Sequence, residues 1–323
     1  MSPQEFVRRH EGDWQALESA MQDKAAQVDM LALPARYRQV CQHLALARER
    51  HYPPALVEKL NRLVVQAHHR LYASREPLAG IVSNFLLAGF PALVRRHAGP
   101  FWLSMLFFYG SYIAMALAVW LHPSVIYSVM DADQVRQFEH MYDPGRRTIG
   151  FERDDASDFF MFGYYIQHNI GIGFQTFAGG MMAGVGSLVI LLFNGIALGA
   201  VSGHLTRIGY SETFWSFVCG HGAFELTAIV LCGMAGLMLG RALVSPGRLT
   251  RAEALRLQAR SAVRIIYGAT LFLVLAAMLE AFWSSSTAIP AQVKYAVAAV
   301  LWSAVALYLA FAGRGRESAD AAR

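Results

Sequence analysis

The stretch from Phe101 to Leu121 contains no charged side chain, and it constrains the fold more than any other part of the sequence. A helix needs about 20 mainly apolar residues to cross the hydrocarbon core of a bilayer. Because lipid offers no hydrogen-bond partner to a free backbone group, only helices and closed barrels span membranes. This stretch therefore predicts a transmembrane helix.

Further apolar stretches of similar length follow along the chain. Only 16% of the residues are charged and 55% are hydrophobic, whereas a soluble domain carries roughly 25% charged residues. We therefore predict an all-α, polytopic membrane protein with about six transmembrane helices. They are expected at residues 101–121, 159–177, 185–205, 214–239, 265–283 and 293–312. The fourth is long enough to be either one continuous span or a span with a re-entrant or broken start.

Residues 1–97 differ in composition, because they are rich in Arg, Glu and His. Ser2 and Pro3 are typical of a helix start, and apolar residues then recur at helical spacing in three segments. We predict a cytoplasmic helical bundle here, ending in an interfacial elbow helix over residues 78–93. Residues 98–323 are expected to form the transmembrane domain.

The charges between the apolar stretches predict the orientation in the membrane. Residues 241–264 carry many arginines against the single acidic residue Glu253, and the positive-inside rule places such a segment in the cytoplasm. Residues 122–158 are acidic and are expected outside, with a short helix before the turn at Asp143. Both termini are then cytoplasmic in a multi-pass inner-membrane protein. The arginines beside the apolar stretches explain the net charge of +5, so we expect no nucleic-acid partner.

Polar residues inside the predicted spans are the candidate functional residues, because they are costly in lipid and usually face the bundle interior. They are His168, Asn169, Asn194, His204, His221 and Glu225. His221 and Glu225 are four residues apart, so they lie on one helix face. Two interpretations stay open. They form a proton relay, metal site or polar substrate contact, or they hydrogen-bond one helix to another.

Other features limit the chemistry that we expect. The sequence has no His-Glu-x-x-His order with a third zinc ligand, so we expect no catalytic residue, metal or cofactor. Glu280 is near the outer end of the fifth span beside Trp283, where its side chain is expected to reach water. Gly195, Gly199 and Gly222 are expected to let helices pack closely, and such small-residue faces are compatible with a homodimer.

Three ordered segments carry a family resemblance, namely YYIQHNIGIGFQTFAGG, FNGIALGAVSG and FWSFVCGHGAFELTAIVLCGMAGLMLG. Together they resemble the stage II sporulation protein M family. The matching residues are Asn169, Asn194, Gly195, Gly199, His221, Gly222 and Glu225. His168 stands where the family usually has another asparagine, and Gly171 stands where an arginine is often found.

The resemblance implies a membrane role without a defined mechanism. The family's namesake works with cell-wall-degrading partners during engulfment as a membrane organiser. We therefore expect a non-enzymatic scaffold that lies in the lipid bilayer and assembles with other membrane or cell-envelope proteins. The alternative is a permease or transporter subunit with a polar path through spans two to four, which predicts a water-filled cavity at the candidate residues.

Overall fold

The computed structural model describes residues 1–22, 33–72, 78–145 and 158–314, which fall into two compact units, 1–80 and 81–323. The described residues are helical and include no strand, so the predicted all-α class is confirmed. The helices of the first unit are α1 (Pro3–Gln22), α2 (Leu33–Glu49) and α3 (Pro54–Tyr72).

Three helices of the first unit share one apolar core. The hydroxyl of Ser2 accepts a hydrogen bond from the backbone N–H of Glu5, which caps α1 where the sequence predicts its start. Phe6 and Trp14 of α1 are buried and pack with residues of α2 and α3. The apolar residues that recur at helical spacing therefore form this core.

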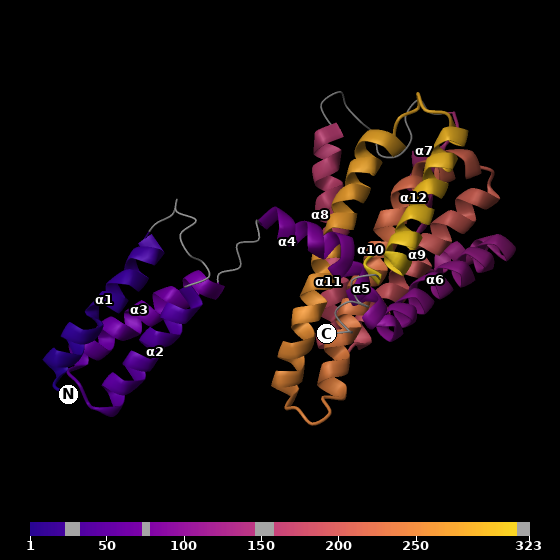
Figure 1. Ribbon diagram of the computed structural model, residues 1–323. Coiled ribbons are helices and arrows are strands. Elements are labelled where there is room, and N and C mark those ends of the chain that lie inside the picture. The colour runs from indigo at the N-terminus through magenta and orange to yellow at the C-terminus, as the bar shows by residue number, and fades with distance from the viewer. Residues whose placement is uncertain (23–32, 73–77, 146–157, 315–323) are drawn as a thin grey trace. The chain divides into compact units, whose positions relative to one another are not determined.

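The second unit contains all the long apolar helices (Figure 1). Its elements are α4 (Leu78–Asn84), the π-helical turn η1 (Phe85–Gly89), α5 (Phe90–Arg96), α6 (Ala98–Leu121), η2 (Pro123–Ser128), α7 (Ala132–Tyr142), α8 (Asp158–Ala178), η3 (Gly179–Met181), α9 (Val185–Arg207), α10 (Ser211–Val244), α11 (Arg251–Leu279), the π-helical turn η4 (Glu280–Ser284) and α12 (Ala291–Phe311).

Five described helices are long and apolar enough to cross a membrane: α6, α9, α10, α11 with η4, and α12. The fourth predicted span is one continuous helix, α10. Helix α8 falls outside this group because polar residues such as Gln167, Asn169 and Gln175 lower its hydropathy. The count of six spans therefore stays a prediction.

Helix α10 lies at the centre of the second unit, in contact with α6, α8, α9, α11 and α12. In its most apolar stretch, 83% of the residues are buried inside the protein. Lipid tails are as apolar as leucine, so close packing rather than the hydrophobic effect holds membrane helices together. A helix buried this completely organises the packing of its neighbours.

Helices α6 and α9 approach each other through a row of glycines. A Cβ atom at Gly195 would lie 2.4 Å from the carbonyl oxygen of Phe108, and one at Gly199 would lie 2.3 Å from that of Tyr112. The predicted packing role of these two glycines agrees with this geometry. Gly222 does not have such a role, since the nearest atoms to a Cβ there are 3.9 Å away.

The turn between α8 and α9 packs against the end of α10, again through glycines. A Cβ atom at Gly180 would lie 2.1 Å from the carbonyl oxygen of Gly236, and one at Gly240 would lie 2.3 Å from the backbone nitrogen of Gly184. Gly184 also has a φ of 86°, a left-handed conformation that favours glycine. The contacts fix one end of α8 and one end of α9 at the same level of α10.

Within the elbow segment, α5 packs on α11 and α12, whereas Ile81 and Val82 of α4 are exposed. The ring of Phe90 is fully buried against Gly268 of α11, where the missing side chain makes room for it. Arg95 donates hydrogen bonds to the carbonyl oxygens of Leu309 (2.9 Å) and Ala312 (2.8 Å) at the end of α12. The second compact unit begins at Ile81, so α5 is part of it, and the predicted domain boundary at residue 97 stays a prediction.

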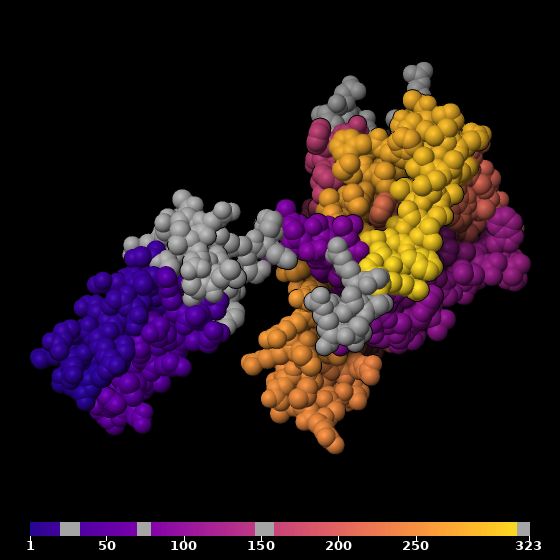
Figure 2. Space-filling model, viewed as in Figure 1, coloured from indigo at the N-terminus to yellow at the C-terminus, as the bar shows by residue number. Residues whose placement is uncertain are grey.

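The polar connections lie at opposite ends of the helical assembly (Figure 1). Helix α7 is the short helix predicted before Asp143, while residues 146–157 of the same connection lie outside the described residues. The hairpin between α10 and α11 projects from the other end (Figure 2). Every arginine of residues 241–264 is exposed there.

We expect Gly199→Ala to lower the stability of the protein by about 1–3 kcal/mol, because the added methyl group collides with the backbone of α6. The matched Gly222→Ala change has room for the methyl group and should be neutral or raise stability by about 0.5–1 kcal/mol. Thermal unfolding of the full chain in detergent measures both. Equal effects of the two changes would contradict the close crossing of α6 and α9.

Candidate functional site

A buried polar cluster lies where the first half of α10 meets the end of α11 and the start of α12. His221 and Glu225 face it from successive turns of α10, with 3.8 Å between Nε2 and Oε2. His221 is 4% exposed. A ring nitrogen of His221 and one carboxylate oxygen from each of Glu225 and Glu280 lie within 4.8 Å of one another. The predicted pair is therefore part of a larger group, the His221 cluster (His221, Glu225, Glu280, Ser284 and Lys294).

The π-helical turn η4 brings Glu280 and Ser284 to this cluster. The hydroxyl of Ser284 lies 3.0 Å from Nδ1 of His221, and Nζ of the buried Lys294 donates to the carbonyl oxygen of Ser284 at 2.7 Å. A π-helical turn inserts an extra residue and so changes the face that later side chains occupy. Glu280 is partly exposed while one of its oxygens lies in the cluster, so the expectation that it also reaches water beside Trp283 stays a prediction.

Tyr142 extends the cluster toward α7. Its side chain is 7% exposed, and its ring packs edge-on against Phe214 with centroids 5.1 Å apart. Burial raises the pKa of Tyr142 above its usual range, and the nearby Glu280, Tyr165 and Glu225 add to this because they repel a phenolate. The Tyr142 side chain is therefore a neutral phenol at any pH near neutrality.

The cluster can do two kinds of chemistry. One imidazole and two carboxylates at this spacing can share protons, and such a set can also hold a divalent cation. Hydrogen bonds at Ser284 also join α10 to η4, and η4 to α12. The geometry therefore fits helix-to-helix bonding directly, and proton or cation binding would be an additional property of the same groups.

The other predicted residues do not meet at this cluster. Asn169 is buried on the inner face of α8, where its Nδ2 has no hydrogen-bond partner among the described residues. The amide of Asn194 donates to the carbonyl oxygen of Ile190 within its own helix. His168 is exposed on the opposite face of α8 from Asn169. Among the described residues, these side chains therefore do not line one common polar path.

His204 has a separate role at the end of α9. Its Nε2 lies 2.7 Å from Oε1 of Glu139, so it anchors α7 to the membrane-spanning helices. A second anchor is the hydroxyl of Thr213, which donates to the carbonyl oxygen of Tyr142 at 2.5 Å. Asp131 and Gln134 form a capping box at the start of α7. The two anchors hold the second half of α7, and the capping box stabilises its first turn.

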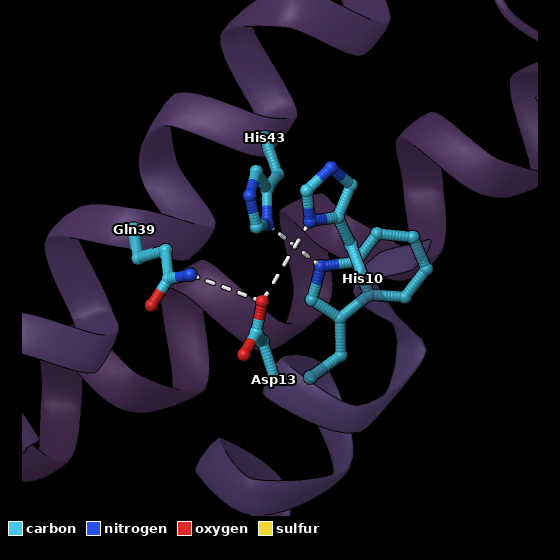
Figure 3. Close-up of polar contacts among 5 residues, drawn as sticks. His10, Asp13, Gln39 and His43 are labelled. Atoms are coloured by element: carbon cyan, nitrogen blue, oxygen red, sulfur yellow. Dashed lines mark hydrogen bonds and ion pairs between the residues drawn. The ribbon is translucent and has the colours of Figure 1, made fainter. Parts of the chain in front are cut away.

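A second group of titratable residues, which the sequence analysis did not identify, lies in the first unit (Figure 3). His10, Asp13 and His43 each offer a ligand atom within 4.8 Å of the others. The indole N–H of Trp14 donates to Nδ1 of His43 at 3.1 Å, and Gln39 donates to Asp13 at 3.0 Å. A metal bound at Nδ1 of His43 would have to displace the indole. We therefore assign this group to packing between α1 and α2.

Stability of the first unit should fall in acid because of His43. Burial, with His10 adding to it and Asp13 opposing it, lowers the pKa of His43 below its usual value of about 6.5. The unfolded chain then binds a proton at His43 more readily than the folded chain does. The free energy of unfolding is therefore unaffected by His43 above about pH 6.5 and falls as the pH drops below that value.

Hydrogen exchange of the backbone amides of α1 and α2 is measured in the full chain and corrected for intrinsic rates. It should become faster as the pH falls from about 7.5 to about 5.5. His43→Gln keeps an acceptor for Trp14 and removes the titrating group, so its exchange should depend less on pH. An unchanged pH dependence in this variant would contradict the role of His43.

We expect Ser284→Ala to lower the free energy of unfolding by about 1–3 kcal/mol, because it leaves Nδ1 of the buried His221 without its partner. Ser286→Ala is the matched control, since the side chain of Ser286 makes no hydrogen bond to a described residue and is partly exposed. Denaturation of the purified full chain compares the two variants. Equal stability would show that the Ser284 bond does not support the cluster.

Two family models match parts of this chain. The family model of stage II sporulation protein M matches residues 104–285, which run from α6 to the end of η4 and include most of the His221 cluster. A domain of unknown function, DUF8413, matches residues 4–73, which cover α1 to α3. Searches of curated proteins and of solved structures found no match. Because the first match covers more than half of the sequence, the chain belongs to the stage II sporulation protein M family.

Proposed function

We propose that this membrane protein is a non-enzymatic scaffold of the bacterial inner membrane that assembles with envelope or cell-wall proteins. In this proposal the first unit and residues 241–264 are cytoplasmic, and α7 is on the outer side. Family membership and the five long apolar helices support a membrane role. The scaffold role rests on the additional observations below.

The observation that carries the proposal is the fixed position of α7. The Glu139–His204 pair and the Thr213–Tyr142 bond hold this helix on α9 and α10. Its other face is polar and open, with the side chains of Asp133 and Arg136 exposed by 88% and 65%. A rigid polar surface outside the apolar helices is what an envelope partner would need for docking, because little ordering entropy is lost on binding.

Packing inside the second unit favours a scaffold over a permease. Glycine contacts bring the backbones of α6 and α9, and of α10 and the α8–α9 turn, within van der Waals distance. A cavity of about 410 Å³ lies among α5, α6, α10 and α12, and mainly apolar side chains such as Trp102, Met105 and Trp302 line it. Its position and lining differ from those of a polar path through spans two to four.

The permease interpretation is the second candidate, and the His221 cluster favours it. The carboxylates of Glu225 and Glu280 lie inside the apolar unit without being fully buried, and they could carry protons or a cation. Proteoliposomes that contain only this chain test it. Proton-coupled or cation-coupled uptake that Glu225→Gln abolishes would support the permease and argue against the scaffold.

The scaffold proposal predicts that Arg136→Glu removes partners. Reversing the charge on the open face of α7 should reduce co-purified envelope proteins from cross-linked native membranes by about tenfold, since unlike charges across an interface would become like charges. Arg256→Glu is the matched control, an identical change on an exposed residue of α11 at the other end of the assembly.

Mass spectrometry of the purified samples compares wild type, Arg136→Glu and Arg256→Glu at equal yields. Partners that the wild type and the control retain, and that the α7 variant loses, are the expected result. The same partners in all three samples would show that α7 is not the docking surface. No specific partner in any sample would argue against the scaffold.

A further inference from the structure

Helix α8 presents a polar stripe on its outer face. This α8 stripe contains Tyr164, Gln167, His168, Gly171 and Gln175, and these residues line a shallow groove together with Ile172. Both glutamines and His168 are exposed, and the rings of His168 and Tyr164 stack with an interplanar angle of 9°. The amides of Gln167 and Gln175 make no hydrogen bond to any residue that the structure describes.

The stripe lies at the depth of the membrane. Gly180 meets Gly236 and Gly184 meets Gly240, so the adjoining ends of α8 and α9 are level, and α9 is apolar enough to span. Gly173, on the inner face of α8, lies against Cys232 within α10. α8 also packs along α11 (Figure 1). Its 21 residues rise about 31 Å, which matches the hydrocarbon thickness.

Lipid is a poor solvent for this stripe. Many exposed side chains on the spanning helices are large and apolar, for example Phe193 on α9 and Val300 and Leu307 on α12. An amide without a hydrogen-bond partner in hydrocarbon costs several kcal/mol. The low hydropathy of α8 comes in part from Gln167 and Gln175 on this face. The stripe therefore requires a polar partner at the same depth.

We propose that a second copy of this chain covers the α8 stripe, forming a twofold dimer along α8. A twofold contact joins a surface to itself, so each group must complement its own copy. Amide, phenol and imidazole groups each both donate and accept hydrogen bonds, and the stripe carries no Asp, Glu, Lys or Arg that would repel its copy. The dimer would serve a scaffold and a permease equally, so it does not depend on the proposed function.

The membrane determines the arrangement of the two helices. Identical chains insert in one orientation, so the twofold axis follows the membrane normal and the two copies of α8 run parallel. Gln167 then pairs with Gln167 of the second copy, and Gln175 pairs with Gln175. Gly171 lies one turn from each, and a Cβ atom there would meet nothing within 4 Å in a single chain. This open glycine lets the two backbones come close.

The first test is Gly171→Leu in the full chain, reconstituted in lipid nanodiscs. The single chain has room for the new side chain, whereas the dimer does not, so the monomer–dimer dissociation constant should rise about tenfold or more with unchanged thermal stability. Gly110→Leu is the matched control on α6, where only a flexible Leu106 atom lies within 4 Å of a Cβ. A wild-type protein that stays monomeric, or a dimer that Gly171→Leu leaves unchanged, would overturn the proposal.

The second test is oxidative cross-linking of Gln167→Cys in native membranes. We expect a covalent dimer of this chain above the background that the natural cysteines give in wild type, while Val300→Cys on α12 should give none. Cross-linking of Gln167→Cys to a different protein would show that a partner other than a second copy covers the stripe. Equal cross-linking at both positions would show random collision and would also overturn the dimer.

Discussion

Contact between helix backbones at glycines is the interaction on which the rest of the second unit depends. Helices in lipid gain no hydrophobic free energy from each other, so their association comes from close packing and hydrogen bonds. Gly195 and Gly199 place α9 directly on α6, and Gly180 and Gly184 place the α8–α9 turn on Gly236 and Gly240 of α10. These contacts set the register in which the polar side chains of the His221 cluster meet.

That register explains where the polar residues lie. Once α10 is held at its centre, His221 and Glu225 are at the level where α11 ends, and the π-helical turn η4 points Glu280 and Ser284 toward them. The same packing leaves Gln167 and Gln175 exposed on the outer face of α8, with no hydrogen bond to a described residue. The buried His221 cluster and the exposed α8 stripe thus arise from the same set of glycine contacts. Of the two, only the α8 stripe needs another protein surface to cover it.

Part of this architecture could be predicted from the sequence. Long uncharged stretches gave the helical membrane class, and the i, i+4 spacing placed His221 beside Glu225. The place of Glu280 in the cluster could not be predicted, because its neighbours His221 and Glu225 belong to another helix and are far away in the sequence. His204 could not be assigned either, since its partner Glu139 is 65 residues away on a separate short helix. Gly222 and Gly199 were both predicted to let helices pack closely. The structure distinguishes them, because only Gly199 lies against the backbone of another helix.

The central claim is that the His221 cluster joins packed helices and does not line a path across the membrane. An experimental structure of the full chain in lipid, at a resolution that shows ordered water, tests this most directly. The account predicts direct contacts from His221 to Ser284 and from Lys294 to the Ser284 carbonyl oxygen, with close backbone packing between α6 and α9. A continuous column of water from either membrane face to Glu225 and Glu280 would contradict it.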